Sequence, residues 1–268
     1  MKESKHKYDE LKIVSMYERG MNTVQLAKYF KTYNTTIRRI LIRHNVKLIS
    51  TGDRMRFVKK NPFNDTRESD YYLGLLIADG CVSGNTVTLG LKESDVYMLE
   101  SYAKFCSPIL PVNNYFHKEH NKLQYEVAFR NSDICRYLQT KANFINKTEK
   151  CEMFIPLNWD IMRGLSDGDG SFFKYNNARN LGWDFANGSK EFCLQVQSFL
   201  KSYGIETTLT YNHCWHLRTC KNSYQIGQFL YFDSNLFLKR KRDIWADCMV
   251  TYKKINTLNS GNPIERQS

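Results

Sequence analysis

Two aspartates, Asp79 and Asp169, end similar apolar segments that lie 90 residues apart in the sequence. The first segment reads YYLGLLIADG over residues 71–80, and the second reads IMRGLSDGDG over residues 161–170. An acid is an unfavourable last residue for a helix, because the C-terminal end of the helix dipole is itself negative. Divalent cations offset this cost, and Mg²⁺ is commonly held by one or two carboxylates together with phosphate oxygens. The two aspartates are therefore candidate metal ligands.

Each aspartate follows two small residues at a four-residue spacing. Gly74 and Ala78 share one face of the first expected helix, and Gly164 and Gly168 share one face of the second. Residues of this size let two helices approach almost backbone to backbone. If the two segments pack together, the two carboxylates lie side by side and repel each other unless cations are present. Two metal ions held there would stabilise the attacking and leaving oxygens of a phosphodiester displacement.

The elements that must position these two segments repeat as well. Alternation and helical periodicity predict strands, a helix, a hairpin and a second helix after each motif. The first set lies at residues 85–92, 94–106, 112–130 and 132–141, and the second set at residues 171–175, 180–187, 189–204, 206–220 and 223–232. Each half reads α-β-β-α-β-β-α in outline. The sequence therefore predicts an α+β fold with two pseudo-symmetric halves whose sheets lie side by side.

The N-terminal region reads as a separate all-α unit. Helical spacing predicts three short helices at residues 8–20, 23–30 and 35–45, with Asn34 or Thr35 as the cap of the third. The pattern resembles a homeodomain-like helix-turn-helix, whose third helix enters a DNA major groove. The side chains that this helix would present are Thr35, Thr36, Arg38, Arg39 and Arg43. The alternative is a plain three-helix unit with a solvated basic face.

Changes in periodicity divide the chain into five stretches. They predict a helix-turn-helix domain at residues 1–50, a basic linker at 51–68, a first repeat at 69–156, a second repeat at 157–255 and a tail at 256–268. The linker is basic and contains a proline, which suits a segment that lies along DNA phosphates.

The charge of the chain indicates a polyanionic partner. The 39 Lys and Arg residues outnumber the 27 Asp and Glu residues, so the formal net charge is +12. An excess of this size favours nucleic acid, with charge for solubility alone as the simpler alternative. The first ten residues are polar rather than signal-like, no run of about 18 apolar residues occurs, and the cysteines include no C-x-x-C pair. These features predict a protein of the cytoplasm or an organelle matrix, neither secreted nor membrane-bound.

Residues 213–220, HCWHLRTC, combine two histidines with two cysteines. A zinc site is one interpretation, but the ligand spacing fits no common zinc pattern. An alternating strand explains the segment better.

Taken together, the two apolar segments resemble the paired motifs of the LAGLIDADG homing endonucleases in their single-chain, two-repeat form. The resemblance covers about residues 69–250. It implies that the final motif acids, Asp79 and Asp169, hold Mg²⁺, with Mn²⁺ as an acceptable substitute. The inner acid of the motif is kept as Asp167 in the second copy but is replaced by Ile77 in the first. Because the inner position is not the metal ligand in that family, the replacement leaves the expected activity intact.

The family also places a lysine after the last helix of each half, near the cleaved phosphates. Here Lys147 follows Asp79 by 68 residues and Lys241 follows Asp169 by 72 residues, and the similar spacings support this pairing. A cation at that place polarises the nucleophilic water or stabilises the developing charge. The alternative is a surface lysine in a basic tract. For the second position the competing cations are Lys239, Arg240 and Arg242.

The strands of both halves would form a saddle over DNA. A family position late in the second strand of each half maps to Lys92 and Asn187, which would hold a metal-bound water. In the first half, Thr86, Thr88 and Lys92 alternate with apolar residues, so they share the face expected to meet DNA. Comparable candidates in the second half are Lys174, Tyr175, Arg179, His216 and Arg218.

The resemblance implies a sequence-specific double-strand DNA endonuclease with a homing role. Because the two halves are not identical, it also implies a long asymmetric target site and a monomeric enzyme. A non-catalytic DNA-binding regulator with the same fold would be expected to have lost a motif acid, and both acids are present. An RNA maturase that assists intron splicing stays open as an alternative, and binding assays with intron RNA would distinguish it.

Overall fold

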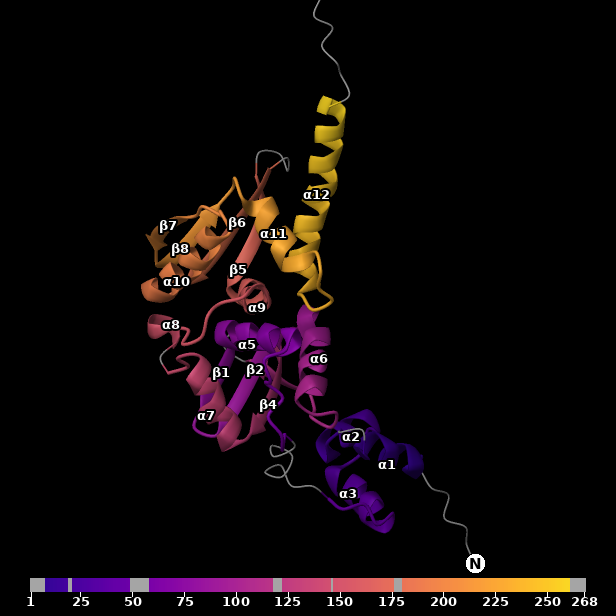
Figure 1. Ribbon diagram of the computed structural model, residues 1–268. Helices are drawn as coiled ribbons and strands as arrows, with labels where there is room; N and C mark the ends of the chain where they lie inside the picture. The colour runs from indigo at the N-terminus through magenta and orange to yellow at the C-terminus, as the bar shows by residue number, and fades with distance from the viewer. Residues whose placement is uncertain are drawn as a thin grey trace, which may run out of the picture.

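The computed structural model describes residues 8–18, 21–48, 58–117, 122–145, 147–175 and 180–260. Figure 1 shows a three-helix unit near the N-terminus, two halves that each contain one sheet, and a long C-terminal helix that projects past the second half. No helix in these ranges is long and apolar enough to cross a membrane.

The N-terminal unit contains α1 (Glu10–Glu18), α2 (Thr23–Tyr29) and α3 (Asn34–Arg43), which confirms the three predicted helices with shorter bounds. Its own small core includes Ile13, Leu26 and Ile37. The predicted cap of the third helix is wrong. The helix begins one residue earlier than expected, so the capping residue is Tyr33. The side chain of Tyr33 makes no capping hydrogen bond. The two predicted caps therefore lie inside the first turn, where the extended backbone of a capping residue is lost.

The first half forms one four-stranded antiparallel sheet with its helices on one side. The strand order is β1-β2-β4-β3. Its elements are α5 (Arg67–Asp79), β1 (Gly80–Ser83), β2 (Thr86–Lys92), the 3₁₀ helix η1 (Glu93–Asp95), α6 (Val96–Cys106), β3 (Asn113–His117), β4 (Lys122–Arg130) and α7 (Ser132–Lys141). A single helical turn, α8 (Lys147–Lys150), leads into the second half.

The second half repeats this arrangement, with the strand order β5-β6-β8-β7. Its elements are α9 (Trp159–Asp169), β5 (Gly170–Tyr175), β6 (Asn180–Asn187), α10 (Lys190–Ser202), β7 (Thr208–Asn212), β8 (Cys214–Thr219) and α11 (Ser223–Tyr231). The final helix is α12 (Lys239–Ser260). Because both halves follow the order α-β-β-α-β-β-α, the predicted α+β fold with two similar halves is confirmed.

Three features differ from the sequence-based expectations. The short strand β1 follows the first motif directly, at residues to which the sequence analysis assigns no strand, because Val82 is its only buried apolar side chain besides the glycine backbone. The helix α5 begins at Arg67, inside the stretch predicted as linker. The helix α12 is not predicted at all, and it runs past residue 255.

The two motif helices, α5 and α9, pack against each other and join the halves. A Cβ added to Gly74 would collide with the backbone oxygen of Ile161, and one added to Gly164 would collide with the backbone oxygen of Tyr71. The backbones therefore meet directly, as the small residues predict. At the end of the pair, a Cβ on Gly168 would collide with the side chain of Ala78.

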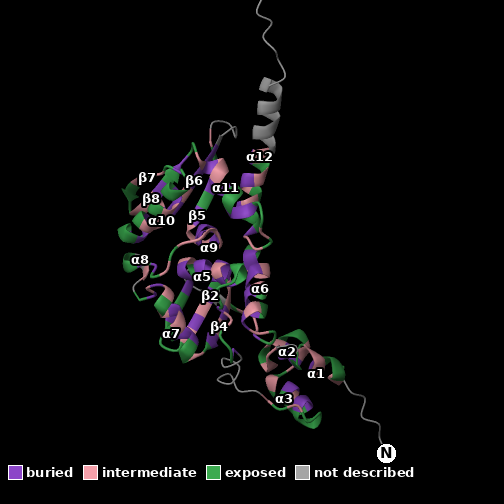
Figure 2. Cartoon of the chain, viewed as in Figure 1, coloured by how far each residue is buried: buried purple, intermediate pink, exposed green. Residues whose placement is uncertain are grey.

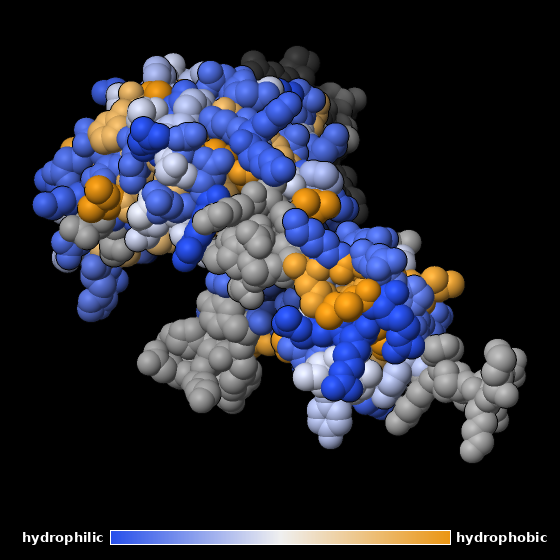
Figure 3. All heavy atoms as spheres, turned by 90° about the horizontal axis from the view of Figure 1, so that it is seen from below, coloured by the Kyte–Doolittle hydropathy of each residue, from blue (hydrophilic) through white to orange (hydrophobic). Residues whose placement is uncertain are grey.

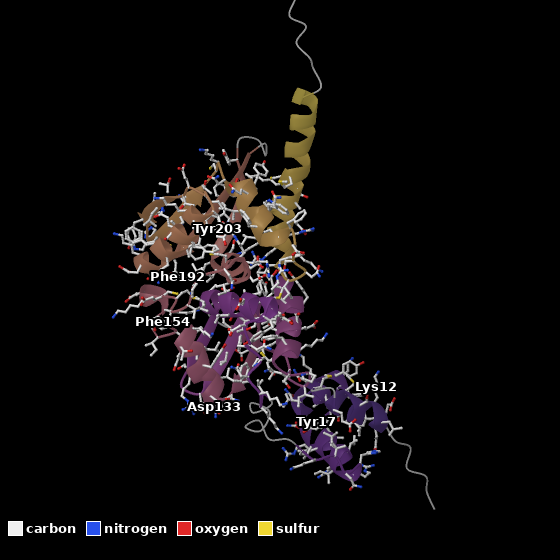
Figure 4. The ribbon with its side chains drawn as sticks, viewed as in Figure 1. Lys12, Tyr17, Asp133, Phe154, Phe192 and Tyr203 are labelled. Carbon is white, nitrogen blue, oxygen red and sulfur yellow. The ribbon has the colours of Figure 1, made fainter. Side chains whose placement is uncertain are left out.

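A continuous core extends from the first half through this helix pair into the second half. Figure 2 shows the buried residues inside both halves and at their junction. In the second half, for example, Phe192 of α10, which Figure 4 labels, packs on Phe185 of β6 with ring centroids 6.1 Å apart. In the first half, Val87 and Leu89 of β2 are fully buried. The sheets therefore pack one face on the core and leave the other face more exposed.

Candidate active site

Asp79 and Asp169 are the last residues of α5 and α9, and the pairing of these helices brings them together. The Oδ2 atom of Asp79 lies 3.3 Å from the place that a Cβ of Gly168 would occupy. Burial, together with the negative charge of Asp79, raises the pKa of Asp169 to about 6. Asp79 is exposed by surface area. The protein atoms that surround its carboxylate still desolvate it, and this desolvation raises its pKa. The arrangement therefore favours a cation between the two acids.

A lysine reaches the C-terminal end of each motif helix. Lys147 Nζ donates to the carbonyl oxygens of Ile77 at 3.0 Å and Ala78 at 2.6 Å, in the last turn of α5. Lys241 Nζ donates to the carbonyl oxygens of Ser166 at 3.1 Å and Gly168 at 2.8 Å in α9, and also to that of Gly170. Cations at these ends bind carbonyls of the last helical turn, where the carbonyl of Ser166 also accepts the N–H of Gly170, and they offset the negative helix dipole.

The site divides into two cavities, one beside each aspartate. The smaller, of about 220 Å³, is lined by Asp169 and Asn187 of the second half and by Lys147, which follows the first half. We call these three residues the Asp169 site. The larger, of about 460 Å³, is lined by Asp79 and Lys92 of the first half and by Arg240, which follows the second half, among other residues. Each cavity therefore combines an acid and a strand residue from one half with a cation that follows the other half.

In the Asp169 site, the strand residue contacts the acid directly. Asn187 Nδ2 donates to Asp169 Oδ2 at 3.1 Å, while Asn187 Oδ1 accepts from the backbone N–H of Ser189 at 2.9 Å. The second bond holds the amide in the orientation that the first requires. Burial lowers the pKa of Lys147, and the charges of Asp169 and Asp79 oppose that change. Asn187 and Lys147 therefore both act on the same carboxylate.

The larger cavity, together with Lys241 behind it, is called the Asp79 site. Lys241 is only 6% exposed. Burial lowers its pKa to about 8, and the strongest opposing charge is that of Asp167. Among the charges that lower the pKa of Asp79, those of Lys241 and Lys147 come before that of Arg240. Lys241 belongs to the Asp79 site because its Nζ donates to the carbonyl of Gly168, which lines the larger cavity, although Lys241 itself lines neither cavity.

Sequence reasoning names Arg240 only as a competitor of Lys241, and it misses Asp95. Arg240 Nε donates to Asp95 Oδ2 at 2.9 Å, and the Asp95 side chain is 2% exposed. The two residues lie 145 positions apart, in η1 and α12. A signal was present in the sequence, since a basic run, KRKR, follows the last helix of the second half. Its partner could not be found without the fold.

The carboxylates of the site meet the needs of a divalent ion that also binds water and phosphate. In the part of the chain that the structure describes, no group of three or more His, Cys, Asp or Glu side chains stands together. The protein thus offers two separate carboxylates with raised pKa values and no closed cage. Mg²⁺ is usually bound in this way, through one or two carboxylates, water and substrate phosphates. The residues fit such an ion.

Most of the other predicted site residues lie on the outer faces of the sheets or on α3, but Lys174 shares the helix-covered face of β5 with the buried Phe172. Thr86 and Thr88 alternate with buried residues along β2, as expected. Lys174 Nζ lies 3.5 Å from a carboxylate oxygen of Asp247 in α12. Tyr175 ends β5 and is half-buried, whereas Arg179 lies outside the described residues.

On the second sheet, Asp184 organises two of the predicted residues. Its carboxylate lies 3.0 Å from His216 Nδ1 and accepts from Arg218 Nε at 3.2 Å. Sequence reasoning missed Asp184, whose position in an aromatic strand gave no signal. The segment HCWHLRTC contains the predicted strand, β8, while His213 lies in the turn before it with a φ of 59°.

On α3, three of the predicted DNA-binding side chains, Thr35, Arg38 and Arg39, are exposed, and Thr36 is half-buried. Arg43 is also exposed, and its Nη1 donates to Glu10 of α1 at 3.0 Å. The face of the molecule seen in Figure 3 is mostly hydrophilic, with hydrophobic side chains gathered over small areas.

Among known protein families, one family model matches part of the second half. Residues 160–230 match the sequence pattern of the LAGLIDADG-like domain. No curated protein sequence matches the chain.

Solved structures extend the similarity to both halves. The homing endonuclease I-WcaI bound to its DNA recognition sequence has a TM-score of 0.52 and 13% identity, and the match covers 75% of this chain and 92% of that one. The LAGLIDADG meganuclease I-AabMI bound to uncleaved DNA gives 0.50 and 10%, with 74% and 92% covered. The meganuclease I-SmaMI bound to uncleavable DNA gives 0.50 and 12%, with 78% and 99% covered. At such low identity these matches show a shared LAGLIDADG fold.

Proposed function

We propose that the protein is a site-specific double-strand DNA endonuclease of the homing type, with one cleavage centre at each aspartate. The observation that carries this proposal is the paired ending of α5 and α9, which places two acids beside two separate cavities. Neither the helix dipoles nor the mutual repulsion favours these acids without cations. The shared fold with DNA-bound homing endonucleases supports the same reading.

Each centre would act on one strand. Asp79 and Asp169 would hold the divalent ions, Mg²⁺ or Mn²⁺, which supply positive charge to the attacking and leaving oxygens. Asn187, held against Asp169 and the N–H of Ser189, would orient a water at one centre. Lys92, which lines the cavity of Asp79, would do so at the other.

The basic side chains would stabilise charge that develops at the phosphates. Lys147 lines the cavity of Asp169. Lys241 binds the carbonyl of Gly168, which lines the cavity of Asp79, and its charge opposes the rise in the pKa of Asp79 that burial causes. Preorganised cations of this kind act most strongly in a site from which water is partly excluded.

DNA would lie across the outer faces of the two sheets, with α3 in a neighbouring major groove. The proposed contacts are Thr86, Thr88, Lys174, Tyr175, His216 and Arg218 on the sheets, and Thr35, Thr36, Arg38, Arg39 and Arg43 on α3. Because the outer faces of the two halves carry different side chains, one chain would recognise a long asymmetric site as a monomer. In this proposal the N-terminal unit is a DNA-binding helix-turn-helix domain, joined by a basic linker to two LAGLIDADG repeats.

The proposal is tested by incubating the protein with DNA that flanks its own reading frame and mapping the ends produced, with Mg²⁺ and then with EDTA. We expect both strands to be cut at one site, only in the presence of the metal. Binding without cleavage would favour a DNA-binding regulator. Tight binding of intron RNA without any cut in DNA would favour a maturase.

A further inference from the structure

The residues that carry Lys241 are held by contacts from both halves. In this stretch, residues 237–241, the N–H of Lys239 donates to Tyr97 Oη at 2.6 Å, and Tyr97 Oη donates to the carbonyl of Phe237 at 3.2 Å. Tyr97 belongs to α6 of the first half. The start of α12 is therefore anchored across the junction, and a contact from the second half completes the support.

That contact comes from Asp167, the inner acid of the second motif, which is fully buried. Its Oδ2 accepts from the backbone N–H of Leu238 at 2.8 Å and from Tyr71 Oη at 2.9 Å, and its Oδ1 accepts from Tyr231 Oη at 3.0 Å. These donors come from α5, from α11 and from the residue just before α12. A buried carboxylate with this many donors joins three elements at one point.

The position of Leu238 decides the position of Lys241. The N–H of Lys241 donates to the carbonyl of Leu238 at 2.9 Å, which closes the first turn of α12. The side chain of Lys241 then returns to α9, where it donates to the carbonyls of Ser166 and Gly168, on either side of Asp167. One acid therefore fixes the backbone from which the lysine extends, beside the carbonyls that the lysine binds.

The described residues of the first half include no buried acid at the equivalent place. Ile77 stands where the second half has Asp167. Lys147 is instead supported nearby, by a bridge between Ala142 and Met153 and by a bond from Asn143 Nδ2 to the carbonyl of Lys150 at 2.7 Å. The two lysines reach equivalent helix ends through different supports.

We propose that Asp167 is a positioning residue for Lys241 and thereby serves only one of the two cleavage centres, the Asp79 site. This inference rests on the proposed function for its effect on DNA and on contacts alone for its effect on Lys241. A purely structural role for Asp167 would slow both strands together, because the helix pair supports both centres. A positioning role would slow the nicking of one strand more than that of the other.

The first test measures the nicking rate of each strand, using the full-length protein, Mg²⁺ and a duplex labelled at both ends that carries the mapped site. Asp167→Asn should slow one strand at least about tenfold more than the other. The affected strand should be the one that Lys241→Met slows and not the one that Lys147→Met slows. Equal slowing of both strands, or no change in their ratio, would overturn the inference.

Milder variants keep the test informative if Asp167→Asn folds poorly. Tyr71→Phe and Tyr231→Phe each remove one bond to Asp167 and should shift the strand ratio in the same direction, by less. Tyr72→Phe is the matched control, because Tyr72 lies beside Tyr71 on α5. Its hydroxyl donates to Ser101 Oγ of α6 at 2.9 Å and not to Asp167. Its strand ratio should equal that of the unmodified protein. A shift as large as that of Tyr71→Phe would contradict the proposal.

The second test requires no cleavage. Lysine acetylation by acetic anhydride, read by mass spectrometry, should spare the buried Lys241 in the unmodified protein. In Asp167→Asn, with folding checked by circular dichroism, Lys241 should become reactive while the reactivity of Lys147 stays the same. Continued protection of Lys241 would overturn the inference even if DNA is cut. If the unmodified protein cuts no DNA, the proposed function fails, and this labelling still decides the role of Asp167.

Discussion

The Asp169 site and the Asp79 site contain similar groups that are positioned in different ways. At the Asp169 site, an asparagine contacts the acid and a half-buried lysine lines the cavity. At the Asp79 site, Lys92 and Arg240 line the cavity, and Lys241, buried behind it, donates to the carbonyl of Gly168. The paired helices keep the two acids equivalent, whereas the segments that follow each half have diverged. The two DNA strands should therefore meet unequal chemistry.

The largest expected effect comes from the two acids. Asp79→Asn and Asp169→Asn should each lower double-strand cleavage by about 100-fold or more, because the charge that holds the metal is lost. DNA binding should persist or strengthen, since repulsion between the acids and phosphate decreases. Linearisation and nicking of a plasmid that carries the site, with gel-shift binding in parallel, measure both effects. Full linearisation by either variant would contradict the assignment of that aspartate as a metal-holding acid.

The next effect distinguishes the two lysines. Lys147→Met and Lys241→Met should each slow one strand by about 100-fold and leave binding nearly unchanged, because a cation that matters mainly in the transition state lowers turnover. Strand-specific end labelling would show opposite strands affected by the two variants. If both variants slow the same strand, the assignment of one lysine to each site is wrong.

The same variants should differ in stability. Lys241→Met removes a charged donor from three backbone carbonyls in the protein interior, of which that of Ser166 keeps the N–H of Gly170, so the free energy of unfolding should fall by about 1–3 kcal/mol. Lys147→Met should cost less, because the side chain of Lys147 is half-buried and water can reach its partners. Urea denaturation of both variants tests this order, and a larger loss for Lys147→Met would reverse the comparison.

The helix pair should affect both sites equally. Gly164→Ala forces a Cβ against the backbone of α5, so we expect a loss of about 1–3 kcal/mol in stability. Both strands should then be cut more slowly by the same factor. Gly90→Ala is the control for stability alone, because Gly90 lines the Asp79 cavity but its added Cβ would meet only the carbonyl oxygen of Tyr125 at an ordinary 3.7 Å. A change in the strand ratio for Gly164→Ala would show that the helix pair is not a shared support.

The smallest effect on chemistry should come from the N-terminal unit. Removing residues 1–50 should weaken DNA binding by about tenfold and flatten its salt dependence, because phosphate contacts are lost. The strand ratio should stay constant, since the three-helix unit contributes no residue to either cavity. Binding titrations at several salt concentrations provide the measurement. Unchanged affinity with the same salt slope would mean that the unit is not a DNA-binding arm.

Much of the fold follows from local patterns. The alternation of Val87 and Leu89 with Thr86 and Thr88 is enough to predict β2 and its buried face. The small residues of the two motifs are enough to predict that α5 and α9 touch, because only such residues permit contact between backbones. By contrast, α12 is not predicted, although Trp245 and Cys248 are buried at helical spacing. Its start is held by the distant residues Asp95 and Tyr97, and no local pattern reveals those contacts.

The sequence by itself determined the two acids, their pairing and the positions of the two lysines, because each rests on a motif that occurs twice at a similar spacing. Only the tertiary structure decided which groups share a cavity. Lys147 meets Asp169 rather than the acid of its own half, and Arg240 meets Asp95 across 145 residues. The reason is physical: both motif helices end at one junction, so the segments that leave each half enter the site of the other, and no local pattern encodes that crossing.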